Sequence, residues 1–93
     1  MRFMVVEHFK EGKARKIYRR AEESGRMLPH GLRYIDSWVS IRLDRCFQLM
    51  ECDDEHLLEQ WIDHWRDLVE FEVIPVTTST DAANRVLNSQ EKK

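Results

Sequence analysis

The fold is decided by the stretch from Arg45 to Val76, which reads RCFQLMECDDEHLLEQWIDHWRDLVEFEVIPV. Its two ends, Arg45–Glu51 and Val69–Val76, are short runs of apolar and polar residues that predict strands. Between them an apolar stripe recurs at the spacing of an amphipathic helix, at Leu57, Leu58, Trp61, Ile62, Trp65 and Leu68. Asp53 or Asp54 is placed to cap that helix, and Pro75 predicts an edge strand or a strand end. The stretch therefore predicts a β-α-β unit.

The preceding part of the chain predicts a similar unit. A strand is expected over Phe3–Phe9 and a helix over Lys13–Ser24, with Gly25 at the position of a left-handed C-cap. A second strand is expected over Leu32–Val39. The connector Ser40–Asp44 is too short for a helix, so this strand and the next one are expected to form a hairpin.

The resulting order, β-α-β-β-α-β, predicts the fold class. Right-handed crossovers turn this order into a ferredoxin-like α+β domain, an antiparallel four-stranded sheet with two helices on one face. We assign this domain to residues 1–80. Residues 81–93 are expected to hold a short helix over Asp81–Leu87 and a flexible tail over Gln90–Lys93.

Composition narrows the classes of partner. The chain has 93 residues and a formal net charge of -2, so general attraction to nucleic acid or to an acidic membrane surface is not expected. No apolar run approaches the roughly 20 residues of a membrane span, and the N-terminus does not resemble a signal peptide. We therefore expect a cytoplasmic protein. On one strand, Cys46 and Cys52 would lie roughly 20 Å apart, too far for a disulfide.

Alternation along the strands divides the side chains of the sheet into two sets. The first set is apolar and suits packing beneath the helices: Phe3, Val5, Phe47, Leu49, Phe71 and Val73. The second set is mixed and is assigned to the helix-free face: Met4, Val6, His8, Cys46, Gln48, Met50, Glu72 and Ile74. A register that places Tyr34, Asp36 and Trp38 opposite Met50, Gln48 and Cys46 would add these three residues to the mixed set.

A face of this composition is too apolar to be fully solvated and too polar for the interior of a monomer. We therefore predict a homodimer in which a partner sheet covers the face and encloses a partly polar pocket. Association also adds burial, which a domain this small needs. The predicted ligand-binding residues are His8, Tyr34, Asp36, Trp38, Gln48, Met50 and Glu72.

A recognisable set of segments runs along the chain: Phe3–Phe9, Gly25–Pro29, Gly31–Tyr34, Asp36–Val39, Cys46–Glu51, Trp61–Ile62 with Trp65, and Phe71–Val76. Together they resemble a family of small bacterial proteins known as a domain of unknown function, DUF3303. The resemblance ends near Thr80. In layout this family is similar to the dimeric α+β-barrel superfamily, which includes cofactor-independent monooxygenases, haem-degrading enzymes, dehydratases and ligand-sensing modules. The resemblance implies the fold, leaves the activity open and carries over no catalytic residue.

Three residues are candidates for proton transfer: His8, Glu72 and Asp36. The unperturbed pKa of a histidine side chain lies near neutrality, so a functional His8 would be a general base or a haem ligand; the other interpretation is a hydrogen-bonded histidine at a strand end. In a partly dry cavity the pKa of Glu72 would rise and its carboxylate could pair with His8. The alternatives for Glu72 are a salt bridge between subunits and a solvated strand residue.

Two further features have two interpretations each. Tyr34 and Trp38 suit either the holding of a planar ligand or the anchoring of a dimer. The apolar loop Arg26–His30 either closes over a pocket as a lid or packs against the edge of the core. Cys52 and His56 alone are too few ligands for a closed zinc site, so we predict no metal and no cofactor.

Three functions remain open from the sequence. The first is a homodimeric small-molecule-binding protein with its pocket on the helix-free face. The second is a cofactor-independent enzyme resembling an oxygenase or an isomerase, in which His8 and a carboxylate transfer protons. The third is a protein-interaction module without a ligand.

Overall fold

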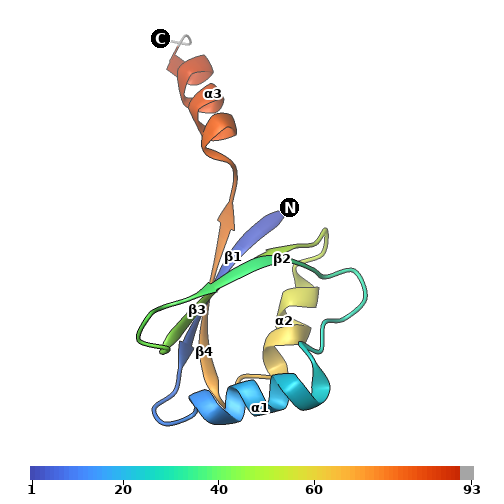
Figure 1. The fold of residues 1–93 in the computed structure, drawn as a ribbon. Coiled ribbons are helices and arrows are strands. Elements are labelled where there is room, and N and C mark those ends of the chain that lie inside the picture. The colour runs from blue at the N-terminus through green and yellow to red at the C-terminus, as the bar shows by residue number, and fades with distance from the viewer. Residues whose placement is uncertain (91–93) are drawn as a thin grey trace.

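The computed structural model describes residues 1–90 and consists of one four-stranded sheet with three helices (Figure 1). The elements follow in the order β1 (Arg2–Phe9), α1 (Ala14–Ser24), β2 (Arg33–Val39), β3 (Arg45–Glu51), α2 (His56–Asp63), β4 (Val69–Val76) and α3 (Ser79–Gln90). The predicted α+β class and the order β-α-β-β-α-β are confirmed, and α3 follows them.

The strands lie in the order β2-β3-β1-β4, and every neighbouring pair is antiparallel, as predicted. This order places β1 and β3 at the centre and leaves β2 and β4 at the edges. Pro75, which lacks a backbone donor, accordingly lies in an edge strand.

The core lies between one face of the sheet and helices α1 and α2. Its most deeply buried large side chains are Phe3, Val5, Met50, Trp61 and Val69. Helix α2 ends at Asp63, earlier than the apolar stripe predicts, because the following chain tightens into turns with hydrogen bonds three residues back. Trp65 and Leu68 nevertheless remain buried in the core, as the stripe predicted.

Helix α1 is tied to the turn after α2 by Arg20. Its guanidinium donates to both carboxylate oxygens of Asp67, at 2.9 and 2.8 Å, and to the backbone oxygen of His64 at 2.8 Å. The hydrogen bonds from Arg20 hold the pKa of Asp67 at about 2. This bidentate pair connects α1 to the turn that follows α2, at one end of the sheet.

The loop after α1 packs against the core, as one of its two interpretations expected. Gly25, at a φ of 67°, ends the helix, and Met27 and Leu28 pack against the core. The indole N–H groups of Trp61 and Trp65 both donate to the backbone oxygen of Arg26, at 3.0 and 3.1 Å. Arg26 is therefore held at a defined place beside the sheet.

The face assigned to the side chains of β3 is wrong. Met50, Gln48 and Cys46 lie opposite Phe3, Val5 and Glu7 of β1 and so share the helix-covered face. Phe47 and Leu49 lie opposite Val6 and Met4 on the helix-free face. The assignment followed apolarity, whereas the structure buries a polar pair, Glu7 and Gln48, beneath the helices.

The register expected for β2 is also wrong, because a β-bulge at Ile35 interrupts the strand. Tyr34 lies opposite Met50, but the register then shifts, so that Asp36 lies opposite Leu49 and Trp38 opposite Phe47. One extra residue reverses the alternation of the side chains. Asp36 and Trp38 therefore lie on the helix-free face, as expected, whereas Tyr34 lies on the helix-covered face.

Helix α3 leaves the end of β4 and points away from the sheet (Figure 1). Its side chains Val86 and Leu87 are exposed. The predicted domain boundary at residue 80 stays a prediction, and the predicted tail, apart from Gln90, lies outside the described residues. Within residues 1–90 no helix combines the length and the apolarity needed to cross a membrane.

Candidate functional site

The candidate site is a pocket of about 260 Å³ between α1 and the helix-covered face of the sheet. We call it the Glu7 pocket. Its lining includes the apolar residues Phe9, Ile17 and Ala21 and the aromatic residues Tyr18, Trp61 and Trp65. Its polar lining is provided by Glu7, Gln48, Ser37 and Arg26. A mainly apolar cavity with a few convergent polar groups is the usual form of a ligand site.

Glu7 is the central polar group of the pocket. It follows Phe3 and Val5 on the inward face of β1, and only 7% of its surface is exposed. Burial raises the pKa of its carboxyl from 4.5 to about 7, although the hydrogen bond from Gln48 and the charge of Arg26 act in the opposite direction. Glu7 can therefore gain or lose a proton near neutral pH.

The two oxygens of the Glu7 carboxyl have different surroundings. Oε2 accepts a hydrogen bond from Nε2 of Gln48, while Oε1 receives no hydrogen bond from the residues that the structure describes. In this part of the chain no fully buried side-chain oxygen or nitrogen lacks a partner. Oε1 is therefore not fully buried, and Glu7 is one of the residues that line the pocket.

Polar contacts continue from Glu7 toward the surface. Nε of Arg26 lies 3.4 Å from Oε1 of Gln48, and the Arg26 guanidinium lies 3.6 Å from the centre of the Tyr34 ring. Such stacking of a cation on an aromatic face is attractive. The Tyr34 hydroxyl in turn lies 2.6 Å from Oγ of Ser37. A buried carboxyl is thus linked through Gln48 to a guanidinium on an exposed residue, Arg26.

Cys46 lines the same pocket, but its thiol is unsuited to nucleophilic attack. Burial, with a further contribution from the neighbouring Glu7, raises the pKa of Cys46 to about 12. The thiolate, which is the reactive form, is therefore scarce at neutral pH. Cys46 and Cys52 are both buried and free, as their expected separation along the strand predicted.

The structure does not bring the seven predicted ligand-binding residues together. Gln48 lines the Glu7 pocket, Tyr34 stacks on Arg26 beside it, and Met50 is fully buried in the core. His8, Asp36, Trp38 and Glu72 lie on the opposite, helix-free face. A single pocket made of all seven is therefore wrong, because the registers of β2 and β3 divide them between two faces.

His8 and Glu72 do approach each other on the helix-free face. Nε2 of His8 lies 3.8 Å from Oε1 of Glu72. Their side chains are 44% and 60% exposed, so the pair lies in water and not in a dry cavity. The proton-transfer role predicted for these residues required a partly dry cavity, and in a single chain neither residue lies in one.

Two residues of the pocket, Glu7 and Arg26, were absent from the sequence-based candidates. The signal for Glu7 is its position between Val5 and Phe9, two residues from each, on the strand face that carries the core. A charged residue there must be buried with a partner or face a cavity. Arg26 follows the helix-ending Gly25, and no sequence pattern indicates that its side chain turns back toward the sheet.

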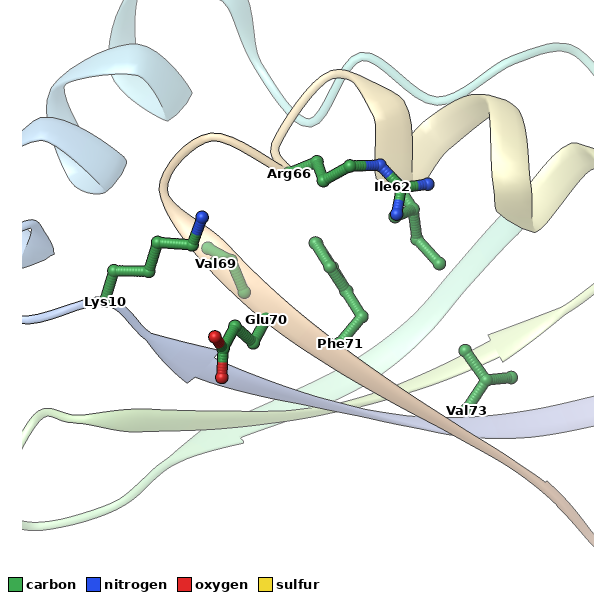
Figure 2. Close-up of a pocket in the computed structure, with 7 residues that line it drawn as sticks. All are labelled: Lys10, Ile62, Arg66, Val69, Glu70, Phe71 and Val73. Atoms are coloured by element: carbon green, nitrogen blue, oxygen red, sulfur yellow. The ribbon is translucent and has the colours of Figure 1, made fainter.

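A second hollow, of about 330 Å³, lies beside β4 and the end of α2. Figure 2 shows that Val69, Phe71 and Val73 of β4 contribute its apolar part, with Lys10, Glu70 and Arg66 also in its lining. These three charged residues are exposed. The hollow is therefore a surface groove and lacks the buried acid of the Glu7 pocket.

The site offers acid–base chemistry more readily than metal chemistry. Across residues 1–90 no group of three or more histidine, cysteine, aspartate or glutamate side chains is arranged to hold a metal ion. The Glu7 pocket combines a proton acceptor, an amide, a guanidinium and an apolar lining.

The family model of DUF3303, a domain of unknown function, matches residues 1–90. No curated protein matches the sequence.

The buried carboxyl predicts a characteristic dependence of stability on pH. The pKa of Glu7 is about 7 in the folded state, whereas the ordinary value of 4.5 applies to the unfolded chain. The folded state therefore binds the proton of this carboxyl more tightly than the unfolded state does. The free energy of unfolding should therefore fall as pH rises from about 4.5 to about 7, by up to about 3 kcal/mol from this group. Urea unfolding at pH 5 and pH 8 should show a smaller fall in Glu7→Gln than in the unsubstituted protein.

Glu22→Gln is the matched control, because Glu22 is exposed on α1 and undergoes the same chemical change. It should follow the unsubstituted protein at both pH values. Equal pH dependence in Glu7→Gln and Glu22→Gln would contradict the assignment of a raised pKa to Glu7.

Proposed function

The chain belongs to the DUF3303 family, a domain of unknown function, and we propose that it binds a small, largely apolar molecule in the Glu7 pocket. The observation that carries the proposal is a buried carboxyl that is held by Gln48 and is part of the lining of a cavity with aromatic walls. The sequence predicted a pocket on the helix-free face of the sheet, whereas the site proposed here lies on the helix-covered face.

The burial of Glu7 is difficult to explain by stability alone. Placing a carboxyl in an apolar environment costs free energy, and the hydrogen bond from Gln48 offsets this only in part. An apolar side chain at this position of β1 would pack with Phe3 and Val5 at no such cost. A polar group retained at this cost beside a cavity supports a functional role.

Size and lining restrict the ligand. A volume of about 260 Å³ lies just below the range for small-molecule pockets, roughly 300–1,000 Å³, so the ligand must be small. The indole rings of Trp61 and Trp65 and the ring of Tyr18 suit a compact body with an aromatic or alicyclic ring. Glu7 and Arg26 give the pocket one acidic and one basic group, so a ligand with no net charge suits it. We propose an uncharged ligand of this kind.

Three probes that share a phenyl ring test this proposal: phenylacetone is neutral, phenylacetate is anionic and phenethylamine is cationic. Phenylacetone should bind most tightly and shift the NMR signals of the Trp61 and Trp65 indole N–H groups. Ala21→Leu, which adds volume to the lining of the pocket, should weaken binding at least about tenfold.

Ala83→Leu is the control for this substitution, since Ala83 is exposed on α3, away from the pocket. It should leave binding unchanged. The proposal fails if none of the three probes shifts the indole signals, or if Ala21→Leu binds as well as Ala83→Leu.

We also propose that the chain forms a homodimer through the helix-free face. No helix covers this face among the described residues, and it carries the partly or largely exposed apolar side chains Met4, Trp38, Phe47, Leu49 and Ile74, whereas Val6 on the same face is buried. Trp38 is 54% exposed and Ile74 40% exposed. Apolar patches of this kind on a sheet are typical of association surfaces.

Charge favours a second copy as the partner. The same face carries Arg45 and Glu72 near one end, and near the other end Glu51 forms an ion pair with Arg33 of its own chain, so both signs are present. A two-fold axis can therefore match each sign with its opposite on an identical surface. Helix α3 projects beyond the sheet with Val86 and Leu87 exposed, and a neighbouring copy would give these side chains a surface to contact.

Sedimentation equilibrium tests the dimer. The unsubstituted protein should have twice the 11.2 kDa mass of one chain, and Trp38→Glu should weaken association at least about tenfold by placing a charge in the interface. Ile41→Glu, in the exposed turn between β2 and β3, should leave the mass unchanged. Sedimentation of the unsubstituted protein as a single chain would contradict the proposal.

A further inference from the structure

We propose that the Glu7 pocket is a proton-transfer site for uncharged carbonyl compounds, with Oε1 of Glu7 as the base and the Arg26 guanidinium as the group that stabilises the enolate. This inference rests on the proposed function, because it assigns chemistry to the ligand bound in that pocket. Both residues line the pocket, and Gln48 lies between them in hydrogen-bond contact with each.

The base is held by one hydrogen bond. Gln48 donates to Oε2, which leaves Oε1 as the carboxyl oxygen without a hydrogen-bond partner among the described residues, and Glu7 lines the pocket. Glu7 and Gln48 lie on β1 and β3, the two central strands, and are nearly completely buried. A base fixed on rigid elements meets the geometric requirement for proton abstraction.

The stabilising group is also held in place. The backbone oxygen of Arg26 accepts hydrogen bonds from both tryptophan indoles, and its guanidinium lies over the Tyr34 ring. Nε is directed at Gln48, whereas Nη1 and Nη2 donate to no residue within the described chain. These terminal nitrogens are therefore available to an oxygen of the ligand, where a positive charge stabilises a developing enolate.

The reaction balances without an oxidant or a further reactant. The C–H bond next to the carbonyl breaks and its proton forms an O–H bond on Oε1 of Glu7. The electron pair of that bond becomes the carbon–carbon π bond of the enolate, and the carbonyl π pair moves to the oxygen near Arg26. If the proton on Oε1 exchanges with solvent, delivery of a solvent proton to the same carbon gives isotope exchange. If a carbon–carbon double bond extends the enolate into a dienolate, delivery to its far carbon gives an isomer. Either delivery restores the carboxylate.

The surroundings also restrict the substrate. The pKa of about 7 suits a base that must be ionised at neutral pH and still hold a proton in the intermediate. A carboxylate or phosphate beside Glu7 would place two anions together in a partly desolvated site. The substrate class is therefore a neutral ketone or aldehyde with a compact ring and an enolisable C–H bond.

Hydrogen–deuterium exchange of phenylacetone in D2O, followed by proton NMR, tests the inference. The unsubstituted protein should accelerate exchange next to the carbonyl, with a rate that rises with pH to a plateau and has its midpoint near 7, because Glu7 must be ionised. Glu7→Gln should lower the rate by about 100-fold or more, the usual contribution of a general base. Arg26→Gln should lower it as well, and Glu22→Gln, exposed on α1, should leave it unchanged.

The outcomes separate the two proposals. Binding of phenylacetone without protein-dependent exchange would overturn proton transfer and leave ligand binding intact. Exchange that persists in Glu7→Gln, shown to be folded by circular dichroism, would also overturn the role of Glu7. If phenylacetone neither binds nor exchanges, the proton-transfer inference fails, and the indole shifts with the other two probes decide the proposed function separately.

Discussion

The hydrogen bond between the Gln48 amide and the Glu7 carboxyl is the constraint on which the site depends. A carboxyl can be kept beneath two helices only where a donor accompanies it, and the antiparallel pairing of β1 with β3 supplies one. That register also brings Met50 and Cys46 inward and turns Phe47 and Leu49 outward. The register that pairs Glu7 with Gln48 thus also decides which side chains of β3 lie on each face of the sheet.

The two faces differ in ways that favour separate roles. On the helix-covered face, α1, the loop at Arg26 and two tryptophans enclose a polar pair beside an apolar cavity. On the helix-free face, Trp38, Phe47 and Leu49 form an apolar surface at which His8 and Glu72 meet in water. Because chemistry is proposed for the first face and association for the second, a dimer formed through the helix-free face would not cover the Glu7 pocket.

The sequence predicted the elements well because periodicity is a local property. The bounds of β3 and β4 were predicted as observed, and the buried stripe that ends at Leu68 was correct even where α2 was shorter. The site was not predicted, because it depends on register. A bulge at Ile35 cannot be derived from alternation alone. The alternation of β1 places Glu7 on the inward face. Its hydrogen-bond partner depends on the register with β3, which places Gln48 opposite Val5, two residues before Glu7.

The most direct test is the ionisation of Glu7 itself, followed by the carbon-13 chemical shift of its side-chain carboxyl as a function of pH. A buried carboxyl at the edge of an apolar pocket should titrate with a midpoint near 7. A midpoint close to the ordinary value of 4.5 would mean that Glu7 is solvated, and it would contradict both the binding site and the chemistry assigned to it.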